Sequence, residues 1–128
     1  MLREQETATW MEMAEQELGG ARRILQADPP LTWMCVFHTQ QAAEKALKAF
    51  LIYHARTFRF LHDLEYLLGL CCEVEPELQE LEKAATVLTP YAVTFRYPPT
   101  HPPDVATAEE AIEHAEKVLT AIRRRLDL

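Results

Sequence analysis

The sequence has few of the residues that mark several common classes of protein. Only 3 of its 128 residues are glycine, which argues against a turn-rich all-β fold and against a glycine-lined phosphate loop. The 3 cysteines include no Cys-x-x-Cys spacing, so they indicate reduced thiols and no zinc site. No apolar run approaches the ~18 residues of a membrane-spanning helix, and the first residues lack the pattern of a signal peptide. We therefore expect a cytoplasmic protein that does not enter a membrane.

The composition is that of one folded domain. A chain of 128 residues with 48% hydrophobic and 26% charged residues is long enough to bury a core of its own. We therefore expect a single domain over residues 1–128. The chain has 13 Lys+Arg against 20 Asp+Glu, a formal net charge of −7. This charge excludes a surface that attracts nucleic acid over its whole area, but it allows a local basic patch.

Helical periodicity runs through almost the whole chain. Apolar residues at steps of three and four predict five helices. They cover approximately residues 7–27, 31–54, 61–72, 76–95 and 107–126. No segment shows the period-two alternation of a strand, and the connections are short. The pattern predicts an all-α fold, an antiparallel up-and-down bundle of four long helices plus one short helix.

Several local features of these helices can be predicted. Gly19 and Gly20 lie inside the first helix, on which Met13 is expected to face the core, and the two glycines suggest a close crossing with another helix. Pro90 predicts a break at about residue 89 of the fourth helix. Thr107 and Glu110 fit a capping box at the start of the last helix.

The second helix is apolar over much of its circumference, so we expect it to lie at the centre of the bundle. Its polar side is expected to face solvent, with Glu44 and Lys48 as an i,i+4 ion pair. That side consists of Gln40, Glu44, Lys45 and Lys48. The aromatic residues on apolar faces indicate core or dimer contacts and no base-stacking platform. They are Trp10, Trp33, Phe37 and Phe50.

Three segments, in this order, resemble the HEPN family (higher eukaryote and prokaryote nucleotide-binding). The first is residues 37–49, which contain QQAAEKALKA, very like the family's signature. The second is His62-Asp63-Leu64, similar to the element that opens the family's following helix. The third is Phe95-Arg96-Tyr97-Pro98, which matches the end of its penultimate helix. The likeness spans approximately residues 6–126.

The resemblance implies a helical bundle that dimerises and has polar groups near the dimer cleft. Many members are encoded beside a minimal nucleotidyltransferase, in toxin–antitoxin-like pairs. The ligand-binding positions that the resemblance implies are Gln41, Glu44, Lys45, Lys48, His62, Asp63 and Tyr97. Each also has a structural interpretation. Lys45, Lys48 and Glu44 suit a solvated helix face, and the His62-Asp63 pair suits a helix start.

Some members of the family are metal-independent ribonucleases with an Arg-x4-6-His motif, and Arg96 and His101 satisfy that spacing. Histidine can transfer the proton of the 2′-hydroxyl, and arginine can hold the phosphate. However, Tyr97 directly follows the arginine, and four prolines place His101 in an irregular loop.

Two hypotheses therefore remain open. One is a non-catalytic nucleotide- or RNA-binding homodimer with a nucleotidyltransferase partner, and the other is a metal-independent endoribonuclease toxin. No cofactor is expected, and the other histidines lie at no mutual ligand spacing for a metal. These are His38, His54 and His114.

Overall fold

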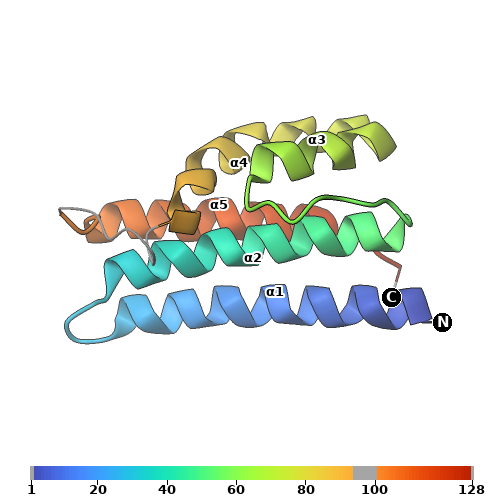
Figure 1. The fold of residues 1–128 in the computed structure, drawn as a ribbon. Helices are drawn as coiled ribbons and strands as arrows, with labels where there is room; N and C mark the ends of the chain where they lie inside the picture. The colour runs from blue at the N-terminus through green and yellow to red at the C-terminus, as the bar shows by residue number, and fades with distance from the viewer. Residues whose placement is uncertain (1, 94–100, 128) are drawn as a thin grey trace.

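The computed structural model describes residues 2–93 and 101–127. Its elements are α1 (Leu2–Gln26), α2 (Thr32–Tyr53), α3 (Leu64–Val74), the 3₁₀ helix η1 (Pro76–Leu81), α4 (Glu82–Leu88), the 3₁₀ helix η2 (Thr89–Val93) and α5 (Val105–Arg123). The described residues form helices and no strand, which confirms the all-α bundle (Figure 1).

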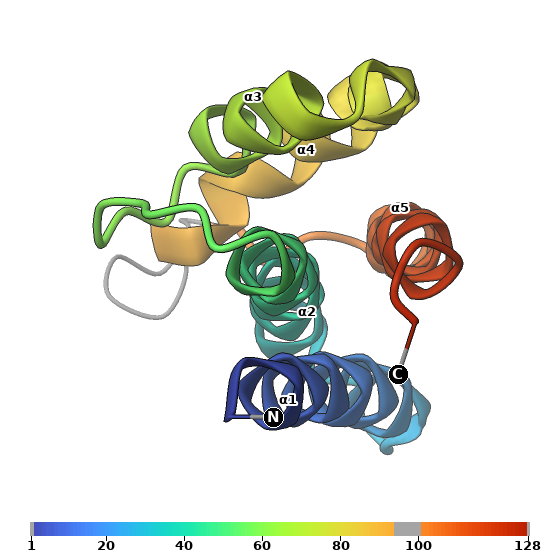
Figure 2. The ribbon, with the colours of Figure 1, turned by 90° about the vertical axis from the view of Figure 1, so that its right-hand side faces the viewer.

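Helix α2 lies at the centre of the molecule. It contacts α1, α3, α4 and α5, and Figure 2 shows it between α1 on one side and the α3–α4 pair on the other. Its residues Leu47, Phe50 and Leu51 are at most 1% exposed. The broad apolar arc of this helix predicted its central position, and the structure confirms it.

The connection from α2 to α3 departs from the simple up-and-down pattern. After Tyr53 the chain turns and runs back along α2 over residues 54–63, so that α3 starts beside the middle of α2 (Figure 1). Helix α3 begins at Leu64, three residues later than the apolar pattern predicted. This returning segment covers part of α2 that would otherwise face solvent.

Helix α1 differs from its prediction in two ways. It begins at Leu2, five residues before the predicted start, and it buries Met11 while Met13 is 37% exposed. The predicted close crossing at Gly19 and Gly20 is wrong, because a Cβ atom built on either glycine meets nothing within 4 Å. Open space, and no neighbouring helix, lies over these two residues.

The predicted fourth helix is divided into three parts. Pro76 opens η1, and α4 ends at Leu88, directly before the segment that contains Pro90, so the predicted break is confirmed. Helix α5 begins two residues before Thr107, and its N-cap is Asp104, whose side chain accepts a hydrogen bond from the Thr107 N–H. The predicted capping box is therefore wrong, since a carboxylate three residues earlier takes that role.

Two expectations about membranes and thiols can be compared with the structure. Among the described residues, no helix is long and apolar enough to cross a membrane. All three cysteines have free thiols, and Cys35 and Cys71 are buried. Burial raises the pKa of the Cys35 thiol to about 11, so this group is a protonated, apolar part of the core at neutral pH.

Candidate functional site

The polar side of α2 is buried, contrary to the expectation that it would face solvent. Gln40 is 0% exposed, Glu44 is 3% exposed and Lys48 is 5% exposed. These residues lie at successive i,i+4 positions, so they share one face of the helix. Phe58 and His62, in the segment that returns from α2 to α3, contact this face, and no sequence pattern indicated that cover.

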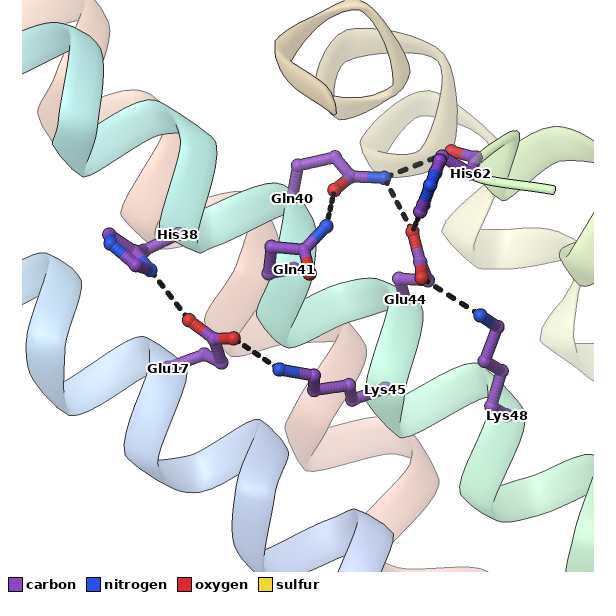
Figure 3. A network of polar contacts seen from close by, with 8 residues as sticks. All are labelled: Glu17, His38, Gln40, Gln41, Glu44, Lys45, Lys48 and His62. Atoms are coloured by element: carbon purple, nitrogen blue, oxygen red, sulfur yellow. Dashed lines mark hydrogen bonds and ion pairs between the residues drawn. The ribbon is translucent and has the colours of Figure 1, made fainter. Parts of the chain in front are cut away.

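The Glu44 carboxylate is the centre of a hydrogen-bonded network (Figure 3). Its Oε2 accepts from Lys48 Nζ at 2.9 Å, and its Oε1 accepts from Gln40 Nε2 at 3.1 Å. His62 Nδ1 lies 2.9 Å from the same Oε1. Burial on its own raises the pKa of Glu44, but the hydrogen bonds from Lys48 and His62 outweigh it and hold that pKa below its ordinary value. Glu44 is therefore an ionised carboxylate at neutral pH.

Lys48 is enclosed by aromatic rings as well as by its carboxylate partner. Its Nζ lies 5.7 Å from the ring centroid of Trp10 in α1 and 5.7 Å from that of Phe58 in the returning segment. Cation–π contacts of this kind stabilise a partly desolvated ammonium group. Lys48 thus neutralises Glu44 inside the protein and is poorly placed to reach a ligand itself.

His62 is the member of the network that reaches the surface. Its side chain is 64% exposed while that of Glu44 is 5% exposed. The backbone is fixed too, because Gln40 Nε2 donates a hydrogen bond to the His62 carbonyl at 2.9 Å. With Nδ1 held by the carboxylate, the ring presents Nε2 to solvent. The arrangement is an oriented histidine that can donate or accept a proton, or bind an anion.

Two of the predicted ligand positions, Asp63 and Gln41, form hydrogen bonds within the chain. Asp63 is the N-cap of α3, and its side chain accepts hydrogen bonds from the N–H groups of Glu65 and Tyr66. The sequence suggested that both His62 and Asp63 serve the start of a helix. The structure confirms this interpretation for Asp63 and not for His62. Gln41 is half-buried and donates from Nε2 to Gln40 Oε1 at 2.8 Å, so it supports the network from its edge.

Lys45 belongs to a second, separate cluster between α1 and α2. It pairs with Glu17, whose other carboxylate oxygen lies 2.6 Å from His38 Nδ1 (Figure 3). Burial raises the pKa of Glu17, but the hydrogen bonds from His38 and Lys45 outweigh this and leave it lowered. Lys45 is half-buried, so its predicted place on a solvated face is also wrong.

Of the predicted catalytic pair Arg96 and His101, only His101 lies among the described residues. Arg96 and Tyr97 lie outside the described residues. His101 lies before α5, where its side chain is exposed. Across the described part of the chain, no group of His, Cys, Asp and Glu residues is arranged to hold a metal ion.

Several of the remaining basic side chains are engaged by carboxylates of the same chain. The ion pairs between elements are Arg22–Glu116, Arg56–Glu73, Arg123–Glu15 and Arg125–Glu75. These pairs are mostly exposed, so each contributes little to stability. They do reduce the positive potential that the described surface can offer to a polyanion.

A family model of the HEPN domain matches residues 7–125 of the chain. The chain belongs to the HEPN family. The crystal structure of the protein TT1696 from Thermus thermophilus is similar to this HEPN domain, with 28% identity and a TM-score of 0.75 over 94% of this chain and 98% of the other. A second crystal structure, of ST0689, "an archaeal HEPN homologue", has 24% identity and a TM-score of 0.76 over 95% and 98% of the two chains, and so shows the same fold. No protein with a curated description matches.

The resemblance to the HEPN signature gave only part of this site. It pointed to Glu44, Lys48 and His62, which the structure brings together. The ligand positions inferred from it did not include Gln40, nor Trp10 and Phe58 around the lysine. The i,i+4 spacing of residues 40, 44 and 48 was visible in the sequence. Whether that face is wet or covered depends on a segment that is distant along the chain.

Proposed function

We propose that this HEPN domain is a homodimeric binding module, and that His62 binds a phosphate group of a nucleotide or an RNA. The observation that carries the proposal is the exposed His62 ring held by the buried Glu44 carboxylate. In its imidazolium form the ring donates Nδ1–H to Glu44 and Nε2–H to a phosphate oxygen, a charge-assisted hydrogen bond. The carboxylate fixes the direction in which the second N–H points.

The energetic cost of the network supports a functional role. Removing Glu44 and Lys48 from water costs several kcal/mol per ion, and well-packed apolar residues commonly stabilise a core at least as well. A buried ion pair is therefore weak evidence for stability alone. In this protein the Glu44 network holds the backbone and the ring of a surface histidine, His62, in a fixed position. A recognition site requires groups that are fixed in this way.

Binding to a nucleotide and to RNA tests the proposal directly. Titration of the full chain with ATP and with a short unstructured RNA, followed by fluorescence anisotropy or calorimetry, gives the two affinities. We expect His62→Ala to weaken binding by about tenfold, the value of one charge-assisted hydrogen bond. His54→Ala is the matched control, because this exposed histidine lies at the C-cap of α2 without a carboxylate partner among the described residues. Equal affinities for His62→Ala and wild type, or no binding by wild type, would contradict the proposal.

A nucleotidyltransferase is the protein partner that we propose, with both proteins in the cytoplasm. The support is membership of the HEPN family together with a net charge of −7 and several surface arginines that pair with carboxylates of the same chain. Such a surface is better suited to a local site and a protein partner than to coating a polyanion. Co-expression with the product of the neighbouring gene and size-exclusion chromatography tests the partnership. Sedimentation tests the homodimer, and a monomer at tens of micromolar would contradict it.

The competing function is a metal-independent endoribonuclease that uses Arg96 and His101. The exposure of His101 before α5 is the observation in its favour. Incubation of the protein with unstructured RNA in the presence of a chelator separates the two functions. A binding module leaves the RNA intact. Cleavage that His101→Ala abolishes would establish the ribonuclease instead.

A further inference from the structure

Phe60 is the most exposed large apolar residue of the described chain, at 96%. It lies in the segment from Ala55 to His62, here called the Phe60 loop. The Leu61 N–H donates to the Arg59 carbonyl at 2.8 Å, which closes a three-residue turn with Phe60 at its tip. The ring therefore projects from the tip of a tight turn, two residues before His62.

The Phe60 loop is fixed on both sides of this ring. On the N-terminal side, the Phe58 ring packs against Lys48, the Arg59 N–H donates to the Tyr66 hydroxyl at 3.1 Å, and the Arg59 guanidinium lies 5.1 Å from the Tyr66 ring centroid. On the C-terminal side, His62 is held by its carboxylate and amide partners on α2. The exposure of Phe60 is thus a property of an anchored backbone.

The charge of the Phe60 loop is opposite to that of the whole protein. Residues 55–62 contain two arginines and no Asp or Glu, in a chain with a net charge of −7. The next carboxylate, Asp63, is occupied at the start of α3. Arg56 forms only a long contact with Glu73, at 3.6 Å, and both side chains are about half exposed. An anionic ligand is therefore favoured at this loop.

A protein interface fits the Phe60 loop less well than a nucleobase does. Stable protein interfaces bury about 800 Å² on each partner around an apolar core, whereas the large apolar neighbour exposed beside Phe60 is Leu61, at 37%. A single aromatic ring with cations beside it is the arrangement that binds an unpaired base and its phosphates. Two residues span at most about 7 Å even in a fully extended chain, so a base on Phe60 lies within reach of the His62 ring.

We propose that the Phe60 loop binds single-stranded nucleic acid, with an unpaired base stacked on Phe60 and the flanking phosphates at Arg59 and His62. This rests on the proposed function and defines its ligand: a strand with exposed bases, in place of a bare phosphate or a duplex. The chemistry is shared by RNA and DNA single strands. Parallel titrations with the two strands of one sequence show which of them the loop prefers.

Phe60→Ala tests the stacking contact. Because the side chain is 96% exposed, its loss leaves the thermal unfolding temperature unchanged. We expect the affinity for a short oligouridylate to fall by about tenfold, while Phe60→Trp retains it and the affinity for inorganic polyphosphate stays the same. Leu31→Ala, at a 41% exposed apolar residue between α1 and α2, is the matched control and leaves the affinity unaltered. In Phe60→Trp, added fluorescence that the oligonucleotide quenches reports the stack directly.

Three results separate failure of this inference from failure of the proposed function. If Phe60→Ala binds the oligonucleotide as wild type does while His62→Ala is weakened, the stacking contact is refuted and the phosphate site stands. If wild type binds neither nucleotides nor single strands, the proposed function itself is wrong. If Phe60→Ala changes the dimer dissociation constant and not the affinity for the oligonucleotide, the loop is a protein contact and the inference is overturned.

Discussion

At the scale of single residues, the balance of charge around Glu44 determines how much folding stability the site costs. The carboxylate is buried with one lysine and one surface histidine as partners. Removal of one partner leaves a buried charge without compensation, whereas replacement of the whole ion pair by neutral groups of similar shape costs far less. Variants of Glu44 and Lys48 therefore measure the cost of the ion pair to the stability of the fold.

Lys48→Met is expected to destabilise the protein by about 3 kcal/mol, because it keeps the volume of the side chain and removes the charge that neutralises Glu44. The double variant Glu44→Gln/Lys48→Met is expected to recover most of that loss. Urea denaturation followed by circular dichroism measures both. A single variant as stable as wild type would show that Glu44 is not buried with its charge in solution.

The main pH dependence of stability follows from two carboxylates that are withdrawn from solvent and whose pKa lies below its ordinary value of 4.5, Glu17 and Glu44. Such a group binds protons more weakly in the folded state than in the unfolded chain. Its contribution to stability is complete above about pH 4.5 and is lost as the pH falls through the folded-state pKa. We expect the free energy of unfolding to decrease below that pH. Glu44→Gln should reduce the slope of this decrease, and an unchanged slope would contradict the geometry of the network.

At the scale of helices, α1 contains the clearest disagreement between local sequence and packing. Gly19 and Gly20 reduce helix stability, and the structure gives neither of them a close contact that would require glycine. The residues are instead next to surface hollows along α1. Packing within this chain therefore does not offset the helix stability that is lost at the two glycines.

Alanine substitution at these glycines is expected to stabilise the protein. Gly19→Ala and Gly20→Ala should each raise the free energy of unfolding by about 0.5–1 kcal/mol, because alanine loses less backbone entropy in a helix and meets no atom here. Gly69→Ala, in α3 and equally open, is the matched control and should gain a similar amount. Urea denaturation measures all three, and a loss of stability specific to residues 19 and 20 would reveal a close contact at α1.

At the scale of the whole molecule, the apolar periodicity was sufficient for the fold class, the number of helices and the central place of α2. It could not give the path of residues 54–63, because a returning loop leaves no periodic pattern. Because the path of residues 54–63 was not predicted, the polar face of α2 was expected to be exposed to solvent. The sequence could not single out Phe60 either, because the exposure of a lone phenylalanine in a loop depends on how the backbone around it is anchored.

The distribution of charge over the molecule predicts the salt dependence of nucleic-acid binding. A net charge of −7 disfavours phosphate contacts over the whole surface, and the proposed contacts lie in the Phe60 loop, at Arg59 and His62. For a single strand, the logarithm of the affinity falls with the logarithm of the salt concentration with a slope of about −0.7 per phosphate contact. We therefore expect a slope of about −1.4 for contacts at Arg59 and His62, or about −2.1 if Arg56 takes part.

Titration of an oligouridylate at several salt concentrations measures this slope. Arg59→Gln should reduce its magnitude by about 0.7, the contribution of one phosphate contact. Arg22→Gln is the control, because Arg22 lies on α1 in an ion pair with Glu116 and should leave the slope unaltered. A slope several times steeper would mean that many cations across the molecule contact the strand. In that case the ion pairs between helices open on binding, and the site is a broad surface in place of one anchored loop.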